Sequence, residues 1–251
     1  MSTLKKVARA CVALLFWIGV WWLAAVAIGK AVILPTPLSV IGALWAMLGT
    51  GEFYLTCLRS IGGIFSGLIL GIVAGTLLAV ITCALKPLDV LLSPAVDVVK
   101  ATPVASVIIV LLFVMTKSIV PMLAAALMVI PILFMNIRRG IASASKDKLE
   151  VAKIYNFTAK KRLKYVYLPS VIPYFSAGCK SALGLAWKAG IAAEVICTPK
   201  STIGTMLYNS KVYLESENLF AWTIVVIILS VIIEKLLIWL LGKALKGGEV
   251  A

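Results

Sequence analysis

Residues 150–169 read Glu-Val-Ala-Lys-Ile-Tyr-Asn-Phe-Thr-Ala-Lys-Lys-Arg-Leu-Lys-Tyr-Val-Tyr-Leu-Pro, a basic stretch that lies between long apolar runs. The spacing predicts a short helix over residues 148–155, with Val151, Ile154 and Tyr155 on one face. Such a short helix cannot bury this apolar face by itself. We therefore expect the face to contact a partner.

The residues that follow predict a turn and a second helix. Asn156 can take the left-handed conformation that ends a helix, and Thr158 suits the N-cap of a second, very basic segment. Leu168-Pro169 then predicts the turn into the next apolar run. We therefore expect the whole loop, residues 138–169, to form a helix-turn-helix.

The sequence on either side of this loop is too apolar for a soluble protein. It is 62% hydrophobic and 14% charged, whereas soluble domains carry about 25% charged residues. A helix needs roughly 20 apolar residues to cross a bilayer. The apolar runs predict six membrane spans, at residues 10–29, 60–85, 101–116, 118–137, 171–197 and 218–241. We therefore expect an all-α membrane protein in which residues 1–251 form a single transmembrane domain.

The basic residues predict how these spans are oriented. The chain has 24 Lys and Arg against 10 Asp and Glu, and most of the Lys and Arg lie inside if the N-terminus is inside. By the positive-inside rule, both termini are then cytoplasmic. This placement accounts for the net charge of +14 without a nucleic acid partner. The first span is expected to be an uncleaved anchor, and a cleaved signal peptide is the alternative.

Two local features predict how the helices begin and pack. Residues 34–37, Leu-Pro-Thr-Pro, end the first span, and residues 38–48 predict a short interfacial helix. In the second span, glycines stand at four-residue steps, at Gly63, Gly67, Gly71 and Gly75. Such a stripe lets another helix backbone approach closely. We expect a helix-packing face there, and a moving seam is the alternative.

The predicted fifth span contains charged residues, each of which costs about 2.5–3.5 kcal/mol inside hydrocarbon. Lys180 and Lys188 share one helix face, and Trp187 and Glu194 share a neighbouring one. One interpretation is that Lys188 pairs with Glu194, or with a backbone carbonyl, inside the bundle. The other is that these four side chains line a water-filled pathway between subunits, in which the lysines favour an anionic or carbonyl-rich solute.

The spacing of the basic loop resembles the EAA loop of ATP-binding-cassette importer permeases. The family pattern is Glu-Ala-Ala, three residues, Gly, nine residues, and Ile-x-Leu-Pro. The corresponding residues here are Glu150, Val151, Ala152, Asn156, Val166, Leu168 and Pro169. The spacing is kept throughout, but Val151 replaces Ala and Asn156 replaces Gly. Asn is the non-Gly residue that best tolerates a positive φ, so the turn should survive.

Further stretches resemble the nitrate, sulfonate and taurine branch of this family. They are residues 34–37, Thr102-Pro103 before the third span, and residues 184–187 with Glu194. The resemblance covers nearly the whole chain. It implies the type I importer permease fold, with six spans and a cytoplasmic coupling helix between spans four and five, in the cell membrane of a prokaryote.

The resemblance also implies a function and a set of partners. Such a chain forms the pathway for a small anionic or polar solute, for example a sulfonate or nitrate, with a second permease subunit that is expected to be an identical copy. An extracytoplasmic binding protein delivers the solute. Two ATP-binding subunits, which hold the ATP and Mg²⁺, grip the coupling loop. The residues that would carry this coupling are Glu150, Val151, Ala152, Asn156, Leu168 and Pro169.

Other classes of protein fit the sequence less well. An ion-coupled secondary carrier or channel also places Lys and Glu in the membrane, but it gives the basic loop no role. An enzyme would need converging carboxylates, His or a nucleophile, and the chain has no His. We therefore expect no catalytic residues, no metal site and no cofactor in this chain. It also lacks the GxxxxGK[ST] pattern of an ATPase.

Overall fold

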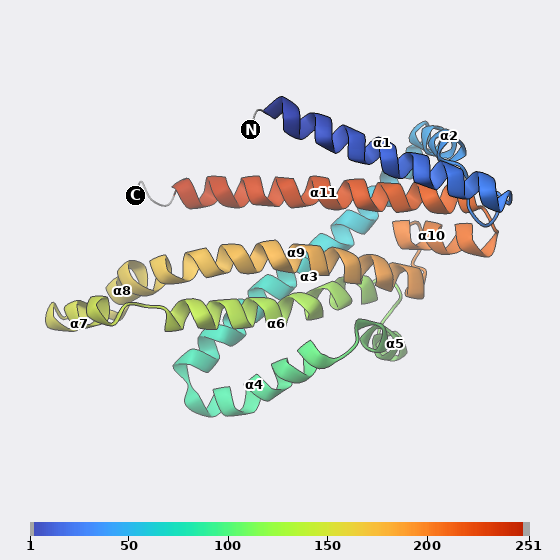
Figure 1. Cartoon of the computed structure of the whole chain (residues 1–251). Coiled ribbons are helices and arrows are strands. Elements are labelled where there is room, and N and C mark those ends of the chain that lie inside the picture. Colours follow the sequence, from blue (N-terminus) through green and yellow to red (C-terminus); the bar gives the residue numbers. More distant parts are fainter. Residues whose placement is uncertain (1–2, 248–251) are drawn as a thin grey trace.

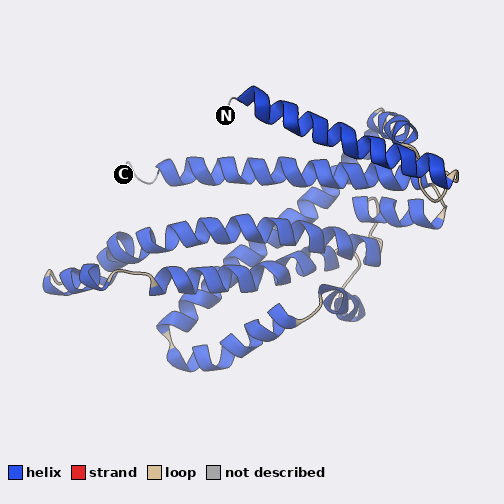
Figure 2. Cartoon of the chain, viewed as in Figure 1, coloured by secondary structure: helices blue, strands red, loops and turns tan. Residues whose placement is uncertain are grey.

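The computed structural model describes residues 3–247, which form helices and the loops that join them (Figure 1). In chain order the helices are α1 (Thr3–Ile28), α2 (Pro37–Leu48), α3 (Gly51–Ala84), α4 (Lys86–Ala101), α5 (Val104–Val114), α6 (Val120–Ala142), α7 (Lys146–Ile154), α8 (Ala159–Arg162), the π-helix η1 (Leu163–Tyr167), α9 (Leu168–Cys197), α10 (Ile203–Val212) and α11 (Ser216–Gly247). Figure 2 shows no strand in this part of the chain. The expected all-α class is therefore confirmed for the described residues.

Four helices in residues 3–247 are long and apolar enough to cross a membrane, namely α1, α3, α6 and α11. A fifth span results if the bent pair of α4 and α5 counts as one. Helix α9 has 30 residues, which gives a length of about 45 Å at 1.5 Å per residue. It is long enough to cross a membrane but does not meet the same test of apolar character, and it carries Lys180, Lys188 and Glu194.

The expected third span at residues 101–116 contains only one helix, α5, whose 11 residues are too few to cross a membrane alone. Helix α4 ends at Ala101, α5 begins at Val104, and the two helices are bent by 107° at the break. Pro103 explains the break, because proline has no N–H to donate and disfavours the helical conformation in the residue before it. Accordingly, Thr102 has an extended ψ of 129°.

Helix α6 lies at the centre of the bundle and packs most extensively against α3 and α9. Gly67, Gly71 and Gly75 of α3 lie directly against the α6 backbone and its side chains. A Cβ atom added to Gly71 would lie 2.5 Å from the Cβ atom of Val129. A Cβ atom added to Gly63 would meet open space. Three of the four glycines in the stripe therefore form a close contact between α3 and α6.

The basic loop folds as two short helices joined by a tight turn. Asn156 ends the first helical segment with a φ of 51°, which is the left-handed conformation. The hydroxyl of Thr158 accepts a hydrogen bond of 3.4 Å from the N–H of Lys161 and so caps α8. The expected turn at Leu168-Pro169 is absent, because α8 continues through η1 into α9. A π-helical turn accommodates a proline and its missing N–H.

The bundle has two distinct ends, which we call the loop end and the α2 end (Figure 1). Helices α7 and α8 lie at the loop end, whereas α2, α10 and the first part of α11 lie at the opposite end. Helix α2 begins where the sequence predicts, with the Thr36 hydroxyl accepting a hydrogen bond of 3.3 Å from the N–H of Ser39. Trp21 attaches α1 to this end, because its Nε1 donates to the carbonyl of Pro35 (3.1 Å) and its ring stacks on Phe220 of α11.

Candidate functional site

The loop end exposes an apolar surface on α7, which we call the α7 face. Ala152, on the inner side of the helix, is only 1% exposed and packs in a small cluster under the loop. On the outer side, Val151, Ile154 and Tyr155 are 48%, 74% and 73% exposed, and Glu150 is exposed beside them. The other residues of the expected coupling motif, Asn156, Leu168 and Pro169, are also exposed. Such a contiguous exposed apolar surface is typical of an interaction site.

The polar and aromatic residues expected to line one pathway lie on two different sides of α9. Lys180 and Lys188 are exposed, and Gly184 between them has open space at its Cβ position. We call these three residues the lysine face. Trp187 and Glu194 are instead 4% and 2% exposed. The interpretation that Lys188 pairs with Glu194 is therefore wrong, because Lys188 is exposed, Glu194 is buried and no ion pair joins them.

Glu194 joins three helices through a buried hydrogen-bond network. Its Oε2 atom accepts a hydrogen bond of 2.8 Å from the Ser60 hydroxyl of α3 and one of 3.0 Å from the N–H of Gly204 in α10. Ser60 Oγ in turn accepts a hydrogen bond of 2.9 Å from the N–H of Ile203. The carboxylate and the hydroxyl thus satisfy two free N–H groups at the start of α10. Glu194 holds α10 against α9 and α3.

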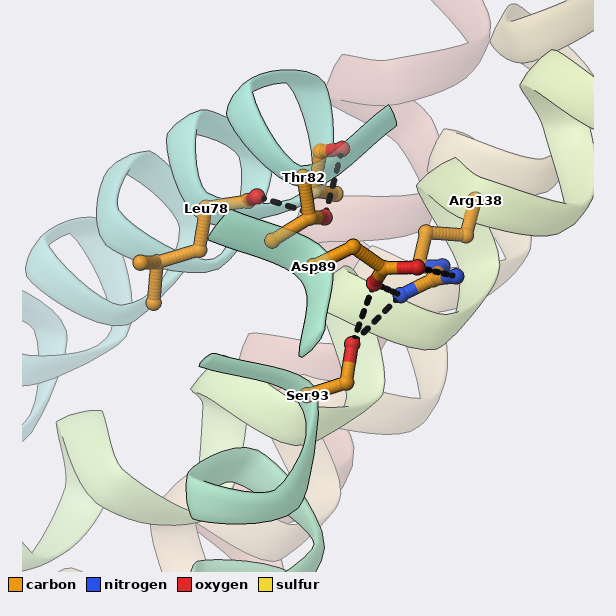
Figure 3. A network of polar contacts seen from close by, with 6 residues as sticks. Leu78, Thr82, Asp89, Ser93 and Arg138 are labelled. Carbon is orange, nitrogen blue, oxygen red and sulfur yellow. Dashed lines mark hydrogen bonds and ion pairs between the residues drawn. The ribbon is translucent and has the colours of Figure 1, made fainter. Parts of the chain in front are cut away.

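A second polar network, which sequence reasoning missed, joins α4 to α6 at the loop end (Figure 3). The Arg138 guanidinium donates to both carboxylate oxygens of Asp89, with a distance of 3.2 Å for Nη2 to Oδ2, and to Ser93 Oγ at 2.7 Å. The Ser93 hydroxyl also donates to Asp89. Asp89 and Ser93 stand four residues apart and so share one face of α4. This spacing was a usable signal, but nothing in the sequence indicated that Arg138 would face them.

The Arg138 network links the start of α4 to the end of α6. Arg138 precedes the end of α6 at Ala142 by one helical turn, and α7 begins at Lys146. A cavity of about 450 Å³ borders the network. The network thus lies about one helical turn before the link that joins α6 to α7.

Comparisons with known proteins agree with this arrangement. The family model described as "Binding-protein-dependent transport system inner membrane component" matches residues 67–244. The putative aliphatic sulfonates transport permease protein SsuC of Bacillus subtilis (strain 168) is 23% identical over 218 residues, which are 86% of this chain and 79% of that protein. The bicarbonate transport system permease protein CmpB of Synechocystis sp. is 29% identical over 170 residues, 65% of this chain and 58% of that protein.

A solved structure shares the fold. It is described as an amino acid ABC transporter with histidines, and it matches with a TM-score of 0.64 at 17% identity, over 76% of this chain and 94% of that chain. The family model covers most of the chain, including the α7 face, the lysine face and Glu194 with its partner Gly204, whereas Ser60 lies just before the matched residues. The protein therefore belongs to the binding-protein-dependent transport system inner membrane component family, the permeases of ATP-binding-cassette importers.

Proposed function

We propose that this chain forms the solute pathway of an ATP-driven importer for a small anion, and that two separate ATPase subunits drive it through α7. The observation that carries the proposal is the α7 face. Val151, Ile154 and Tyr155 expose apolar surface on a short helix that projects from the loop end. An ATPase cleft would bury this surface, and the exposed Glu150 would set its orientation. ATP and Mg²⁺ would be held by the ATPase subunits.

The connections of α7 explain how closure of the ATPase dimer would reach the membrane. Helix α7 is joined to α6 by a short link, and to α9 through α8 and η1. Because α6 and α9 pack extensively against each other, a displacement of α7 acts on both helices at once. Rigid elements of this kind switch between two arrangements rather than bend continuously.

Six spans follow if the bent pair of α4 and α5 and the charged α9 are counted with the four apolar helices. The start of α1 and the end of α11 point toward the loop end (Figure 1). The loop is rich in Lys and Arg, and such segments stay in the cytoplasm. We therefore place both termini in the cytoplasm and the α2 end outside.

The lysine face supports an anionic solute and a second permease subunit. Lys180 and Lys188 would each cost about 2.5–3.5 kcal/mol if they faced lipid. A second copy of the chain, placed with its lysine face opposite, would enclose a cationic pathway. The relatives named for aliphatic sulfonates and bicarbonate suggest solutes of this charge. An extracytoplasmic binding protein would deliver the solute to the α2 end.

Purification of the chain from its native membranes tests the coupling. A soluble ATPase should co-purify with the wild-type chain, and Ile154→Asp should release it. Leu163→Asp is the matched control, because Leu163 is also exposed in the loop but lies outside the α7 face. Uptake by the chain without any ATPase would instead identify a carrier.

The pathway is tested separately by Lys188→Met. This variant should assemble with its partners but lose most uptake, because the cationic lining is lost. Lys235→Met, which removes an exposed lysine of α11, should leave uptake unchanged. Normal uptake by Lys188→Met would show that Lys188 does not line the pathway.

A further inference from the structure

A cavity of about 340 Å³ opens at the α2 end, where α2, α3, α10 and α11 meet. Its walls are largely apolar. Met47 of α2 and Met206 of α10 line it, together with Phe53 and Trp222, whose rings stack with centroids 5.3 Å apart. This cavity lies at the end of the bundle opposite to α7 and is separate from the lysine face.

The charged groups in and around this cavity are negative. Glu52, which is exposed, is the only charged residue in the lining. Asn218, also in the lining, donates a hydrogen bond of 2.8 Å to Glu215 and so holds a second carboxylate at the rim. An anion such as a sulfonate would be repelled here. The cavity is therefore not a station for the solute of the proposed pathway.

A buried polar atom in the wall is left without a partner. Thr56 is 0% exposed, and its Oγ1 atom has no hydrogen-bond partner in the described structure. Buried hydroxyl groups are almost always hydrogen-bonded, so an unpartnered one in a cavity wall indicates a missing polar group. Apolar walls, an unpartnered hydroxyl and a carboxylate at the opening together fit a long side chain with a cationic end. The aliphatic stem of Lys or Arg packs on apolar surface while its charged end donates to polar groups.

We propose that this cavity receives a lysine or arginine side chain of the extracytoplasmic binding protein when that protein docks. The proposal rests on the proposed function, because it assumes that the α2 end faces the side from which the solute arrives. The charged end of the side chain would enter first, donating to Thr56 Oγ1 and pairing with Glu52, which stand one helical turn apart on α3. The aliphatic stem behind it would pack against Met47 and Phe53. A charged contact at the rim of an interface sets the rate and orientation of docking.

The test uses the complete transporter, reconstituted in lipid vesicles with its ATPase subunits. It is titrated with the binding protein that supports uptake by the wild-type complex, and ATP hydrolysis is measured. Glu52→Lys should raise the concentration of binding protein needed for half-stimulation roughly tenfold or more, with unchanged basal hydrolysis. Glu217→Lys makes the same charge change at an exposed carboxylate outside the cavity. It should have a much smaller effect.

A second pair of variants tests the shape of the cavity without changing charge. Ala46→Trp fills the cavity from α2 and should weaken stimulation as strongly as Glu52→Lys does. Ile41→Trp places the same side chain on an exposed position of α2 outside the cavity and should not. The Lys and Arg residues of the binding protein are then replaced by Glu one at a time. One of these binding-protein variants should restore the stimulation of ATP hydrolysis in the Glu52→Lys transporter.

Two results would overturn the proposal. One is an unchanged titration for both Glu52→Lys and Ala46→Trp. The other is an effect of Glu52→Lys that follows the phosphatidylethanolamine content of the vesicles, which would assign the cavity to a lipid headgroup. If the wild-type complex showed no stimulation at all, the proposed function itself would fail. The two failures are therefore distinguishable.

Discussion

Replacing Glu194 by leucine should destabilise the protein far more than replacing it by glutamine. In the leucine variant, the Ser60 hydroxyl and the Gly204 N–H both lose their acceptor. Both donors are buried, and a buried unsatisfied donor costs about 1–3 kcal/mol. The two together therefore cost about 2–6 kcal/mol. Glutamine keeps an oxygen that can accept both hydrogen bonds, so most of the network should survive.

Thermal unfolding of the purified protein in detergent measures this difference. In a chain of this size, a change of 1 kcal/mol shifts Tm by about 2–4 °C, so the leucine variant should melt on the order of 10 °C lower. The glutamine variant should stay within a few degrees of the wild type. Glu234→Leu, the same change at an exposed position of α11, is the control and should have little effect.

The network also predicts non-additivity. Ser60→Ala removes the donor to Glu194 and the acceptor of the Ile203 N–H. The double variant Ser60→Ala with Glu194→Leu should therefore be less destabilised than the sum of the two single variants, by about 0.5–3 kcal/mol. Equal Tm values for the wild type and Glu194→Leu would refute the reasoning. So would a glutamine variant that melts as low as the leucine variant.

Three further substitutions test other parts of the structure. Gly71→Ala should lower the free energy of unfolding by about 1–3 kcal/mol, and therefore lower Tm, because its Cβ would lie 2.5 Å from the Cβ of the facing valine. Gly63→Ala should leave Tm unchanged, because open space surrounds that position. Asn156→Val should destabilise the turn after α7 by about 1–2 kcal/mol, because Asn156 has a positive φ that valine rarely adopts. Less ATPase should then co-purify with this variant. Asn156→Gly should co-purify with as much ATPase as the wild type. Arg138→Met should leave Tm almost unchanged, because its partner Asp89 is about one-third exposed and solvent screens the ion pair. Its uptake should nevertheless fall, and exchanging the two charged residues should restore it.

The sequence predicted best the features that depend on a few neighbouring residues. The first helix of the loop, the left-handed Asn156 and the cap at Thr158 follow from local backbone and side-chain chemistry. The turn expected at Leu168-Pro169 failed for a related reason. The sequence rule treats proline as the start of a new helix, but a π-helical turn absorbs it here.

Features that depend on distant contacts could not be predicted. Helical spacing correctly separated Lys188 from Glu194 by face, but it could not say which face would be buried. That choice depends on Ser60, which lies 134 residues earlier in the chain. The bend between α4 and α5 likewise carries a local signal, Pro103, but its angle of 107° reflects the packing of both helices on the rest of the bundle.

The glycine contact between α3 and α6 also limits where the transporter can flex. Two helices that interlock at Gly67, Gly71 and Gly75 cannot slip past each other by a turn, because side chains of α6 would collide with the α3 backbone. We expect this pair of helices to move as one rigid unit. Alternating access would then be a rotation of other helices relative to this rigid pair. Larger residues in place of these glycines would prevent the two helices from packing rather than alter the extent of that rotation.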